Sequence, residues 1–348
     1  MGKINQKYIA DQLNLSITTV SRCFTNHPRI NPETRAKVYQ LAAELGYNYN
    51  AFRNQKPCKR TDKGTIGVLV GASEKVTDAA GVAGKIFTGI TQKAAALDYR
   101  VELFFMNPTE FKPNMRSRRI IPNSSRNDWT GIILIFPFQE EAVKALMTKF
   151  QVISVLDEYE ELDVDSINPD QGRGIAKMVR HLINYGHRKI GFLSWKYAID
   201  TPWVQTRMGS YFEHLYRAGI PYNPDHVLIV DENDAWNSCK VADLVFEKVR
   251  NLGITGFVCA ADHQAYELIR RLQERGIRVP EDVSITGYDG IPVPVGMPKL
   301  TTYSTPFTEV GTTGMVSLQR RIDHPLASRS HVLVDGSIIM GVTTRKIG

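Results

Sequence analysis

Residues 9–22 read IADQLNLSITTVSR, a stretch that combines helix punctuation with an apolar face. Asn5 can cap a first helix, and Asn14 tolerates the left-handed backbone of a tight turn. Ser16 can then cap a second helix over Ile17–Phe24. The stretch therefore predicts two short helices joined by a tight turn.

A third helix is indicated over residues 31–46, NPETRAKVYQLAAELG. Asn31 can cap it, Pro32 suits the first helical position, and Gly46 ends it. Two helices around a short turn with a supporting helix are typical of a helix-turn-helix domain, whose second helix enters the major groove of DNA. A generic three-helix bundle with a basic surface is the alternative.

The second helix offers side chains suited to reading bases. Val20 is expected to face the core, whereas Ile17, Thr18 and Arg22 can face outward. Arginine pairs bidentately with a guanine edge, and isoleucine can only make apolar contacts, for example with a thymine methyl group.

The net charge of +7 lies entirely at the N-terminus. Residues 1–64 contain eleven Lys and Arg and four Asp and Glu, which leaves 32 basic and 32 acidic residues in the rest of the chain. This asymmetry favours a head that binds a polyanion on a neutral body, although a solvated basic tail would have the same charge.

Several classes of protein are disfavoured by composition. No run of about 18 apolar residues is present, and MGKINQKYIA at the N-terminus has no apolar signal core, so we expect a cytoplasmic protein without a membrane span. The four cysteines (23, 58, 239 and 259) have neither disulfide-framework nor metal spacing, so we expect no metal site.

Short motifs of the N-terminal region resemble the head of the lac repressor/galactose repressor (LacI/GalR) family of transcriptional regulators. The matching residues are Ile9-Ala10, Leu15-Ser16, Thr19 to Arg22, Pro32 to Arg35 and Leu45 to Tyr47. The resemblance implies that Ile17, Thr18 and Arg22 read bases. The same resemblance implies that four further residues contact phosphates of the DNA backbone: Ser16, Ser21, Arg29 and Arg35.

The segment 48–64, NYNAFRNQKPCKRTDKG, is a polar and basic linker. In the resembled family a hinge helix lies here, folds on DNA and wedges a leucine into the minor groove. Asn50 and Ala51 match that pattern, whereas Tyr49 replaces the family proline and Lys56 the leucine. We therefore expect Lys56 to contact phosphate, or Phe52 to supply apolar contact between paired hinges.

From Thr65 onward, short apolar strands alternate with helical patterns, which predicts parallel sheets covered on both faces. The expected strands are Thr65–Val70, Val101–Met106, Gly131–Phe136, Val152–Leu156, Lys189–Leu193, Val227–Val230, Thr255–Cys259 and Ser284–Tyr288. The expected helices are Ile86–Leu97, Glu140–Lys149, Gly174–Tyr185, Arg207–Ala218, Asn237–Asn251 and Ala265–Arg275. This number of strand–helix units is too large for one sheet. The predicted fold class is therefore an all-α head followed by an α/β domain of two doubly wound subdomains.

The body also resembles the family, through segments such as Gly186 to Ile190, Cys259 to Asp262 and Gly287 to Asp289. The resemblance implies a periplasmic-binding-protein-like effector domain that crosses three times between two lobes. The expected domains are 1–47 (helix-turn-helix), 48–64 (hinge) and 65–348 (effector binding and dimerisation). Lobe one would hold 65–160 and 293–323, and lobe two 161–292 and 324–345.

Candidate effector contacts follow strand ends, where doubly wound folds bind ligands. Arg207 aligns with the family's anchoring arginine, and its guanidinium suits paired hydroxyls or a carboxylate. Asp289 matches a family contact and can accept two hydrogen bonds. Trp236 falls where the family places a stacking aromatic, and Ser73 and Gln139 follow two other strands. Ala261 stands where the family commonly has Asn, which removes one hydroxyl contact.

These residues predict a sequence-specific DNA-binding regulator, most simply a repressor. It would bind a pseudo-palindromic double-stranded operator as a homodimer and respond to a sugar or sugar derivative. A purine or nucleoside effector and a sugar-binding protein without a regulatory role are the alternatives. No GxSxG, HExxH, P-loop or dinucleotide motif is present, so neither an enzyme nor a cofactor is expected.

Overall fold

A computed structural model gives the structure of this chain, and it contains the protein alone. It describes residues 5–24, 30–31, 34–35, 37–38, 41–42, 48–50, 63–71, 77–116, 120–121, 128–197, 201–231 and 240–347.

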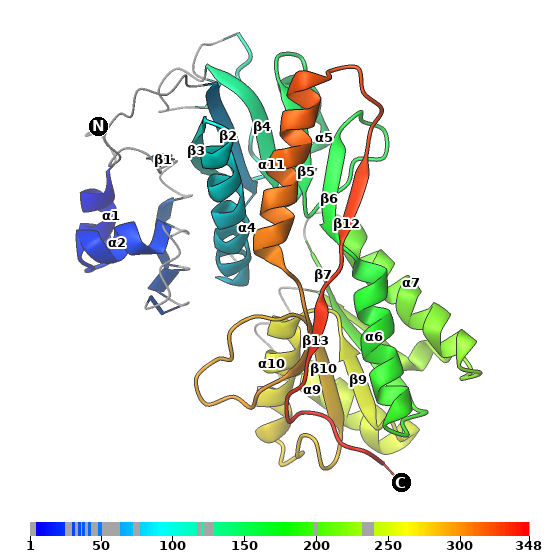
Figure 1. Ribbon diagram of the computed structural model, residues 1–348. Helices are drawn as coiled ribbons and strands as arrows, with labels where there is room; N and C mark the ends of the chain where they lie inside the picture. The colour runs from blue at the N-terminus through cyan, green and yellow to red at the C-terminus, as the bar shows by residue number, and fades with distance from the viewer. Residues whose placement is uncertain are drawn as a thin grey trace. The chain divides into compact units, whose positions relative to one another are not determined.

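The head begins with two short helices (Figure 1), α1 (Gln6–Gln12) and α2 (Ile17–Phe24). The Asn5 side chain caps α1 by accepting a hydrogen bond from the Tyr8 amide over 2.9 Å. Asn14 has a φ of +52°, the left-handed turn conformation that was predicted for it. The Ser16 hydroxyl accepts a hydrogen bond from the Thr19 amide over 3.0 Å, which confirms the expected cap of α2.

Part of the third expected helix lies within the described residues. Residues 34–35, 37–38 and 41–42 are helical, and the Arg35 amide donates to the Asn31 carbonyl over 3.0 Å. Val38 and Ala42 are fully buried. So are Ile9 and Val20 of the first two helices, and Phe24 is almost fully buried. The helices of the head therefore bury apolar side chains, which a solvated basic tail would not.

The chain divides into two compact units. The first unit consists of residues 1–168 and 307–334, and the second unit of residues 169–306 and 335–348. The chain thus crosses three times between the units, at 168/169, 306/307 and 334/335.

These crossings lie later than the positions expected from the family pattern, which were after residues 160, 292 and 323. The crossings lie later because the strands next to them belong to sheets other than the expected ones. β6 (Asp165–Pro169) and β12 (His331–Val334) extend the sheet of the first unit, and β11 (Thr301–Ser304) pairs in the sheet of the second unit.

The first unit contains a seven-stranded sheet in the order β1-β3-β2-β4-β5-β6-β12. Its central pairs are parallel, and β1 pairs antiparallel with β3. The strands not yet given are β1 (Asn48–Asn50), β2 (Gly64–Gly71), β3 (Tyr99–Met106), β4 (Trp129–Ile135) and β5 (Gln151–Val155). Neighbouring β2 and β4 are almost continuously apolar because both faces of the sheet are covered.

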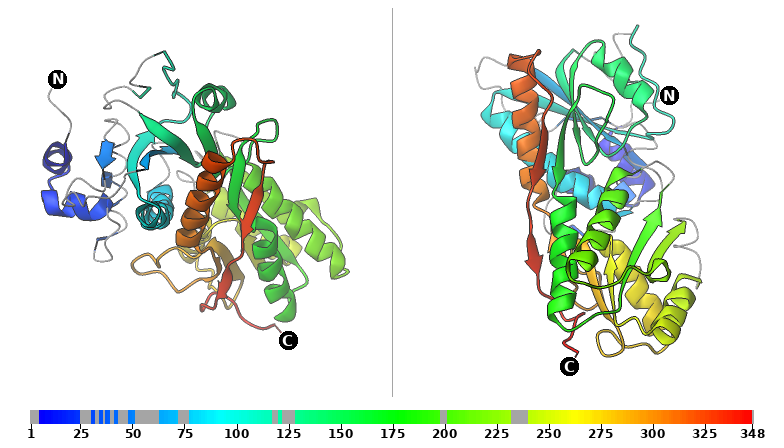
Figure 2. Two further views of the ribbon diagram at one scale, coloured as in Figure 1. Left: turned by 45° about the horizontal axis from the view of Figure 1, so that its top comes forward. Right: turned by 90° about the vertical axis from the view of Figure 1, so that its right-hand side faces the viewer.

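Helices α4 (Thr77–Ala96) and α11 (Phe307–Asp323) lie side by side on one face of this sheet (Figures 1 and 2), and α5 (Glu140–Met147) covers the other. Two glycines permit the close contact of α4 with α11. A Cβ atom on Gly89 would lie 1.9 Å from the Thr308 carbonyl oxygen, and one on Gly311 would lie 2.0 Å from that of Ile86. No other residue type fits at either position without moving a helix.

The second unit contains a six-stranded sheet in the order β13-β11-β10-β9-β7-β8, parallel except for β13. Its remaining strands are β7 (Ile190–Lys196), β8 (Val227–Asp231), β9 (Gly256–Cys259), β10 (Ser284–Asp289) and β13 (Ser337–Ile339). One face packs against α6 (Gln171–Asn184) and α7 (Pro202–Arg217), the other against α9 (Lys240–Glu247) and α10 (Asp262–Gln273). Two short helices, η1 (Pro224–His226) and η2 (Lys248–Leu252), complete it.

Two doubly wound sheets that follow a helical head in the chain confirm the predicted fold class. Each expected strand forms, with its ends shifted by at most three residues. The expected helix 86–97 begins earlier, at Thr77, and the first residues of the expected helix 237–251 lie outside the described residues. Helix α11 and strands β1, β6, β11, β12 and β13 were not predicted.

Candidate functional site

The outer face of α2 carries the residues that were predicted to read bases. Ile17, Thr18 and Arg22 are exposed, whereas Val20 and Cys23 are buried. Ile17 leaves 49% of its surface exposed, although an isoleucine in the core of a small domain would normally be covered. This helix therefore presents an apolar, a hydroxyl-bearing and a cationic side chain at its surface, each of a type that can contact base edges in the major groove.

The other predicted DNA contacts are less uniformly placed. Ser16 is exposed at the N-terminus of α2, where helix amides favour phosphate, and Ser21 is half-buried. Arg35 is half-buried and close to Cys23, whose thiol pKa is raised to about 11 by burial against the opposing effect of the Arg35 cation. Asn50 ends β1, opposite Glu102. The remaining predicted contacts, Arg29, Ala51, Phe52 and Lys56, lie outside the described residues.

A second candidate site lies at the carboxyl ends of neighbouring strands in the second unit. Strands β10, β9 and β7 are adjacent and parallel, so the residues that follow them meet at one edge of the sheet. Asp289 ends β10, Ala260 follows β9, and Tyr197 follows β7. This edge is where open α/β sheets bind ligands.

Arg207, in α7, reaches this edge with only 4% of its surface exposed. Its Nε donates to Gln171 Oε1 over 2.6 Å, and Nη1 donates to the Ala260 carbonyl oxygen. Its Nη2 lies 3.4 Å from Asp289 Oδ1. A buried cation is tolerated only with such partners, so the guanidinium is held in one place by three elements of the unit.

Two aromatic rings cover the guanidinium. Arg207 Cζ lies 3.5 Å from the ring centroid of Tyr288 and 4.3 Å from that of Trp203. Stacking on aromatic rings suits the planar, weakly hydrated guanidinium. The Arg207 side chain is therefore oriented by its faces as well as by its edges.

Asp289 has a backbone φ of +122°, which is rare for a residue other than glycine. Such strain persists only where the surroundings impose it and is concentrated at functional sites. The backbone beyond it is fixed by Asp262, whose carboxylate accepts hydrogen bonds from the Thr302 hydroxyl over 2.5 Å and the Ile291 amide over 2.9 Å. Asp262 thus holds the loop after β10.

Three further side chains lie at the same edge. The Tyr197 hydroxyl is 3.2 Å from His263 Nε2 and accepts a hydrogen bond from Gln264 Nε2 over 3.0 Å. Its ring also contacts Trp203, with centroids 5.4 Å apart. Burial and the nearby Arg207 cation lower the pKa of His263 to about 3, so its imidazole is neutral.

The structure brings Arg207 and Asp289 together, but not every predicted effector contact. Gln139 belongs to the first unit, where it is exposed just before α5 and makes no capping bond. Ser73 and Trp236 lie outside the described residues. Sequence reasoning missed Gln171, Tyr197 and His263, which have no motif of their own; only their positions after or near strand ends could have indicated them.

The described part of the chain contains no group of three His, Cys, Asp or Glu side chains placed to hold a metal ion. No helix within it has the length and apolar character that crossing a membrane requires.

Comparison with known proteins gives two matches to family models. Residues 7–50 match the model of bacterial regulatory proteins of the lacI family, and residues 179–344 match that of the periplasmic binding protein-like domain. The first match spans the head from residue 7, and the second spans most of the second unit together with residues 307–334 of the first.

Curated relatives match along nearly the full chain. The ribose operon repressor of Haemophilus influenzae is 26% identical, over 92% of this chain and 92% of its own length. A repressor named PurR from Aliivibrio salmonicida is also 26% identical, with 91% of each chain covered. Among solved structures, the regulator CelR in complex with cellobiose has a TM-score of 0.68 at 19% identity, covering 98% of this chain and 99% of that one, and shares its fold.

A helix-turn-helix head on a two-sheet periplasmic-binding-like body defines the class of DNA-binding transcriptional regulators that respond to small molecules. Within that class, this chain belongs to the LacI/GalR family. Its relatives are regulators of transcription and not enzymes.

Proposed function

We propose that this chain is a transcriptional repressor of bacterial genes whose affinity for its operator is controlled by a sugar bound in the second unit. It acts in the cytoplasm as a homodimer, and the two heads read the halves of a pseudo-palindromic site. Residues 1–47 form the DNA-binding domain, 48–64 the hinge, and the rest the sensor. Ile17, Thr18 and Arg22 read bases, while Ser16, Ser21, Arg29 and Arg35 contact phosphates.

The observation that carries the effector assignment is the pair of buried Arg207 and half-buried Asp289 at the carboxyl edge of the sheet. The guanidinium supplies donors and the carboxylate supplies acceptors, which together match the paired hydroxyl groups of a sugar. Because the two charges cancel and His263 is neutral, the site favours an uncharged ligand over a phosphate or carboxylate.

A purine effector is the second candidate, since one relative is named PurR. A flat base needs an open aromatic face on which to stack. Arg207 already covers one face of Tyr288 and one face of Trp203. Tyr288 is also fully buried, and the Trp203 ring contacts Tyr197 as well. The arrangement therefore favours a sugar, and a purine becomes an outcome to be tested.

Binding of D-ribose, cellobiose, hypoxanthine and guanine can be measured by calorimetry with the full-length protein and with Arg207→Ala. We expect a sugar to bind the unchanged protein and to alter its affinity for the palindromic site of its own promoter region. Arg207→Ala should weaken that sugar at least tenfold, because charge-assisted hydrogen bonds are lost.

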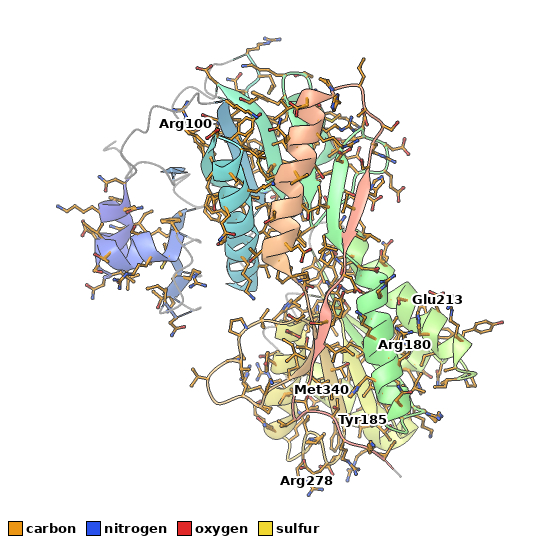
Figure 3. All side chains as sticks on the ribbon, in the orientation of Figure 1. Arg100, Arg180, Tyr185, Glu213, Arg278 and Met340 are labelled. Atoms are coloured by element: carbon orange, nitrogen blue, oxygen red, sulfur yellow. The ribbon has the colours of Figure 1, made fainter. Side chains whose placement is uncertain are left out.

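Arg180→Ala is the matched control. Figure 3 labels Arg180 on α6, where the side chain is exposed and its Nε donates to the Ala176 carbonyl oxygen. Sugar affinity should not change in this variant. Binding of a purine in place of the sugars would transfer the proposal to the second candidate, and sequence-independent DNA binding at physiological salt would contradict a specific repressor.

A further inference from the structure

The chain passes between the two units three times, and at each crossing a short segment of the second unit adjoins the crossing point. Gln171 lies just after the crossing at 168/169, Thr305 just before that at 306/307, and Asp335 directly after that at 334/335. Each of these residues is connected, inside the second unit, to the Arg207–Asp289 pair.

Two of the connections are short. Gln171 Oε1 accepts a hydrogen bond from Arg207 Nε over 2.6 Å. The Thr305 amide donates to the Asp289 carbonyl oxygen over 3.2 Å. The candidate ligand residues thus hold the first two crossing segments directly.

The third connection passes through two stacked tyrosines. Tyr288, whose ring centroid lies 3.5 Å from Arg207 Cζ, contacts Tyr303 with ring centroids 4.9 Å apart. The Tyr303 hydroxyl donates to Asp335 Oδ1 over 2.7 Å. The Tyr288 hydroxyl also donates, over 3.2 Å, to the carbonyl oxygen of Asp170, which directly precedes Gln171.

The tyrosine pair has no free space in which to move independently. Both rings are fully buried. A Cβ atom on Gly174 of α6 would lie 2.3 Å from the Tyr288 ring and 2.7 Å from the Tyr303 ring, so the glycine is what lets the rings pack on that helix. Burial raises the pKa of both phenols, so both hydroxyls remain protonated donors at any physiological pH.

Asp335 is held from its other side by cations. Lys177 Nζ donates to it over 3.0 Å, and Arg173 lies 3.3 Å away. Burial opposes its charge, but the hydrogen bonds from Tyr303, Lys177 and Arg173 outweigh this and lower the pKa of Asp335 to about 2. Asp335 is therefore a permanently charged anchor where the chain enters the second unit.

We propose that Tyr288, Tyr303 and Asp335 form a relay that couples ligand binding at Arg207 to the crossing segments, and hence to operator affinity. This inference rests on the proposed function. Tyr303 and Asp335 are positioning residues, since they contact Arg207 only through Tyr288. A ligand that draws the guanidinium toward its own oxygens shifts Tyr288, and the packed pair passes the shift to Asp335. Coupling follows if the two arrangements of the relay differ in ligand affinity.

Tyr303→Phe tests the relay because it removes one hydroxyl and keeps the stacked ring. In the full-length protein, the affinity for D-ribose or cellobiose should change less than threefold. The ratio of operator Kd values with and without saturating sugar should fall three- to tenfold, the range of one hydrogen bond. Tyr216→Phe, at a side chain that is 85% exposed on α7, should preserve the ratio. An unchanged ratio in Tyr303→Phe would overturn the relay, and so would a sugar affinity that falls by as much as the ratio.

Two variants of Asp335 separate coupling from a structural role. Asp335→Asn keeps an acceptor for the Tyr303 hydroxyl, whereas Asp335→Ala removes it. The relay predicts that Asn retains most of the operator response and Ala loses it. Equal loss in both variants, with melting temperatures lowered alike, would assign Asp335 to charge pairing with Lys177 and Arg173 alone.

If neither sugar binds, the proposed effector is rejected, but the relay can still be tested by a double-mutant cycle. Operator Kd is measured for Arg207→Gln, for Tyr303→Phe and for the double variant without any sugar. Coupled residues give a double variant whose fold-change differs at least threefold from the product of the two single changes. Independent, multiplying effects would refute the relay.

Discussion

Asp262 is a carboxyl group with 1% of its surface exposed at the first position of α10. Burial raises its pKa to about 6, and this outweighs the hydrogen bonds from Thr302, Ile291 and Gly290 and the attraction of Arg207. The residue that holds the loop beyond Asp289 therefore carries a proton through part of the mildly acidic range.

The raised pKa predicts how stability depends on pH. The folded chain keeps the Asp262 proton up to pH 6, whereas the unfolded chain releases it near pH 3.8, so this group's contribution to the unfolding free energy falls as pH rises between the two values. Relative to Asp262→Asn, which has no such proton, the unchanged protein should lose up to about 3 kcal/mol across that window. Urea unfolding at several pH values measures the difference, and a difference independent of pH would contradict the assignment.

At the scale of residues, the charged side chains of the candidate ligand site could be predicted from the sequence better than the residues that hold them in place. The position of Arg207 and Asp289 at this edge could be predicted because each lies at or after a strand end and matches a family position, and their contact with an effector stays a prediction. Gln171 could not, because its role depends on a contact with a residue 36 positions away. The exposure of Ile17 and Arg22 on α2 was predicted correctly, since helical periodicity alone separates them from Val20.

At the scale of elements, the contact between α4 and α11 depends on glycine. Gly311→Ala would place a Cβ atom 2.0 Å from the Ile86 carbonyl oxygen, which is backbone and cannot rotate away. Although alanine favours a helix by about 1 kcal/mol, overpacking typically costs 1–3 kcal/mol or more, so we expect about 2 kcal/mol of net destabilisation. Thermal unfolding measures it.

Gly209→Ala provides the matched control for this substitution. Gly209 lies within α7, and a Cβ atom there would have no neighbour within 4 Å. The same change should therefore stabilise the protein by up to about 1 kcal/mol. If both variants melted at the same temperature, close packing of the two helices would not be the reason for Gly311.

The elements that the sequence did not reveal share a physical cause. Helix α11 reads FTEVGTTGMVSLQRRID, in which glycine, threonine and valine lower helix propensity, so packing on α4 and the sheet decides its structure. Strands β6, β11, β12 and β13 have only three to five residues, and β12 and β13 are partly exposed strands at sheet edges. Such short segments become strands because a neighbouring strand offers hydrogen bonds, which local composition does not record.

At the scale of the whole molecule, charge separates the two activities. All of the net +7 lies in residues 1–64, while Arg207 is buried and its charge is balanced by the half-buried Asp289. Raising KCl from 50 to 200 mM should weaken operator binding by about a thousandfold, because neutralised phosphates release counterions. Sugar affinity of the same protein should hardly change.

Anisotropy of labelled operator and calorimetry with sugar, in the same buffers, check this prediction. A salt-sensitive sugar affinity would mean that an exposed charge takes part in the ligand site. Operator binding that is insensitive to salt would show that the basic head and linker do not contact the DNA phosphates.

The three crossings also set the order in which the chain can complete its domains during synthesis. The first unit starts at the N-terminus, yet α11, which covers one face of its sheet, ends at Asp323, and its edge strand β12 ends at Val334. A nascent chain that has emerged as far as residue 300 has α4 to cover part of that face, but the part that packs against α11 is still exposed. The unit whose sequence begins first is therefore completed only after Val334 has been synthesised, and until then part of its apolar sheet stays exposed to aggregation.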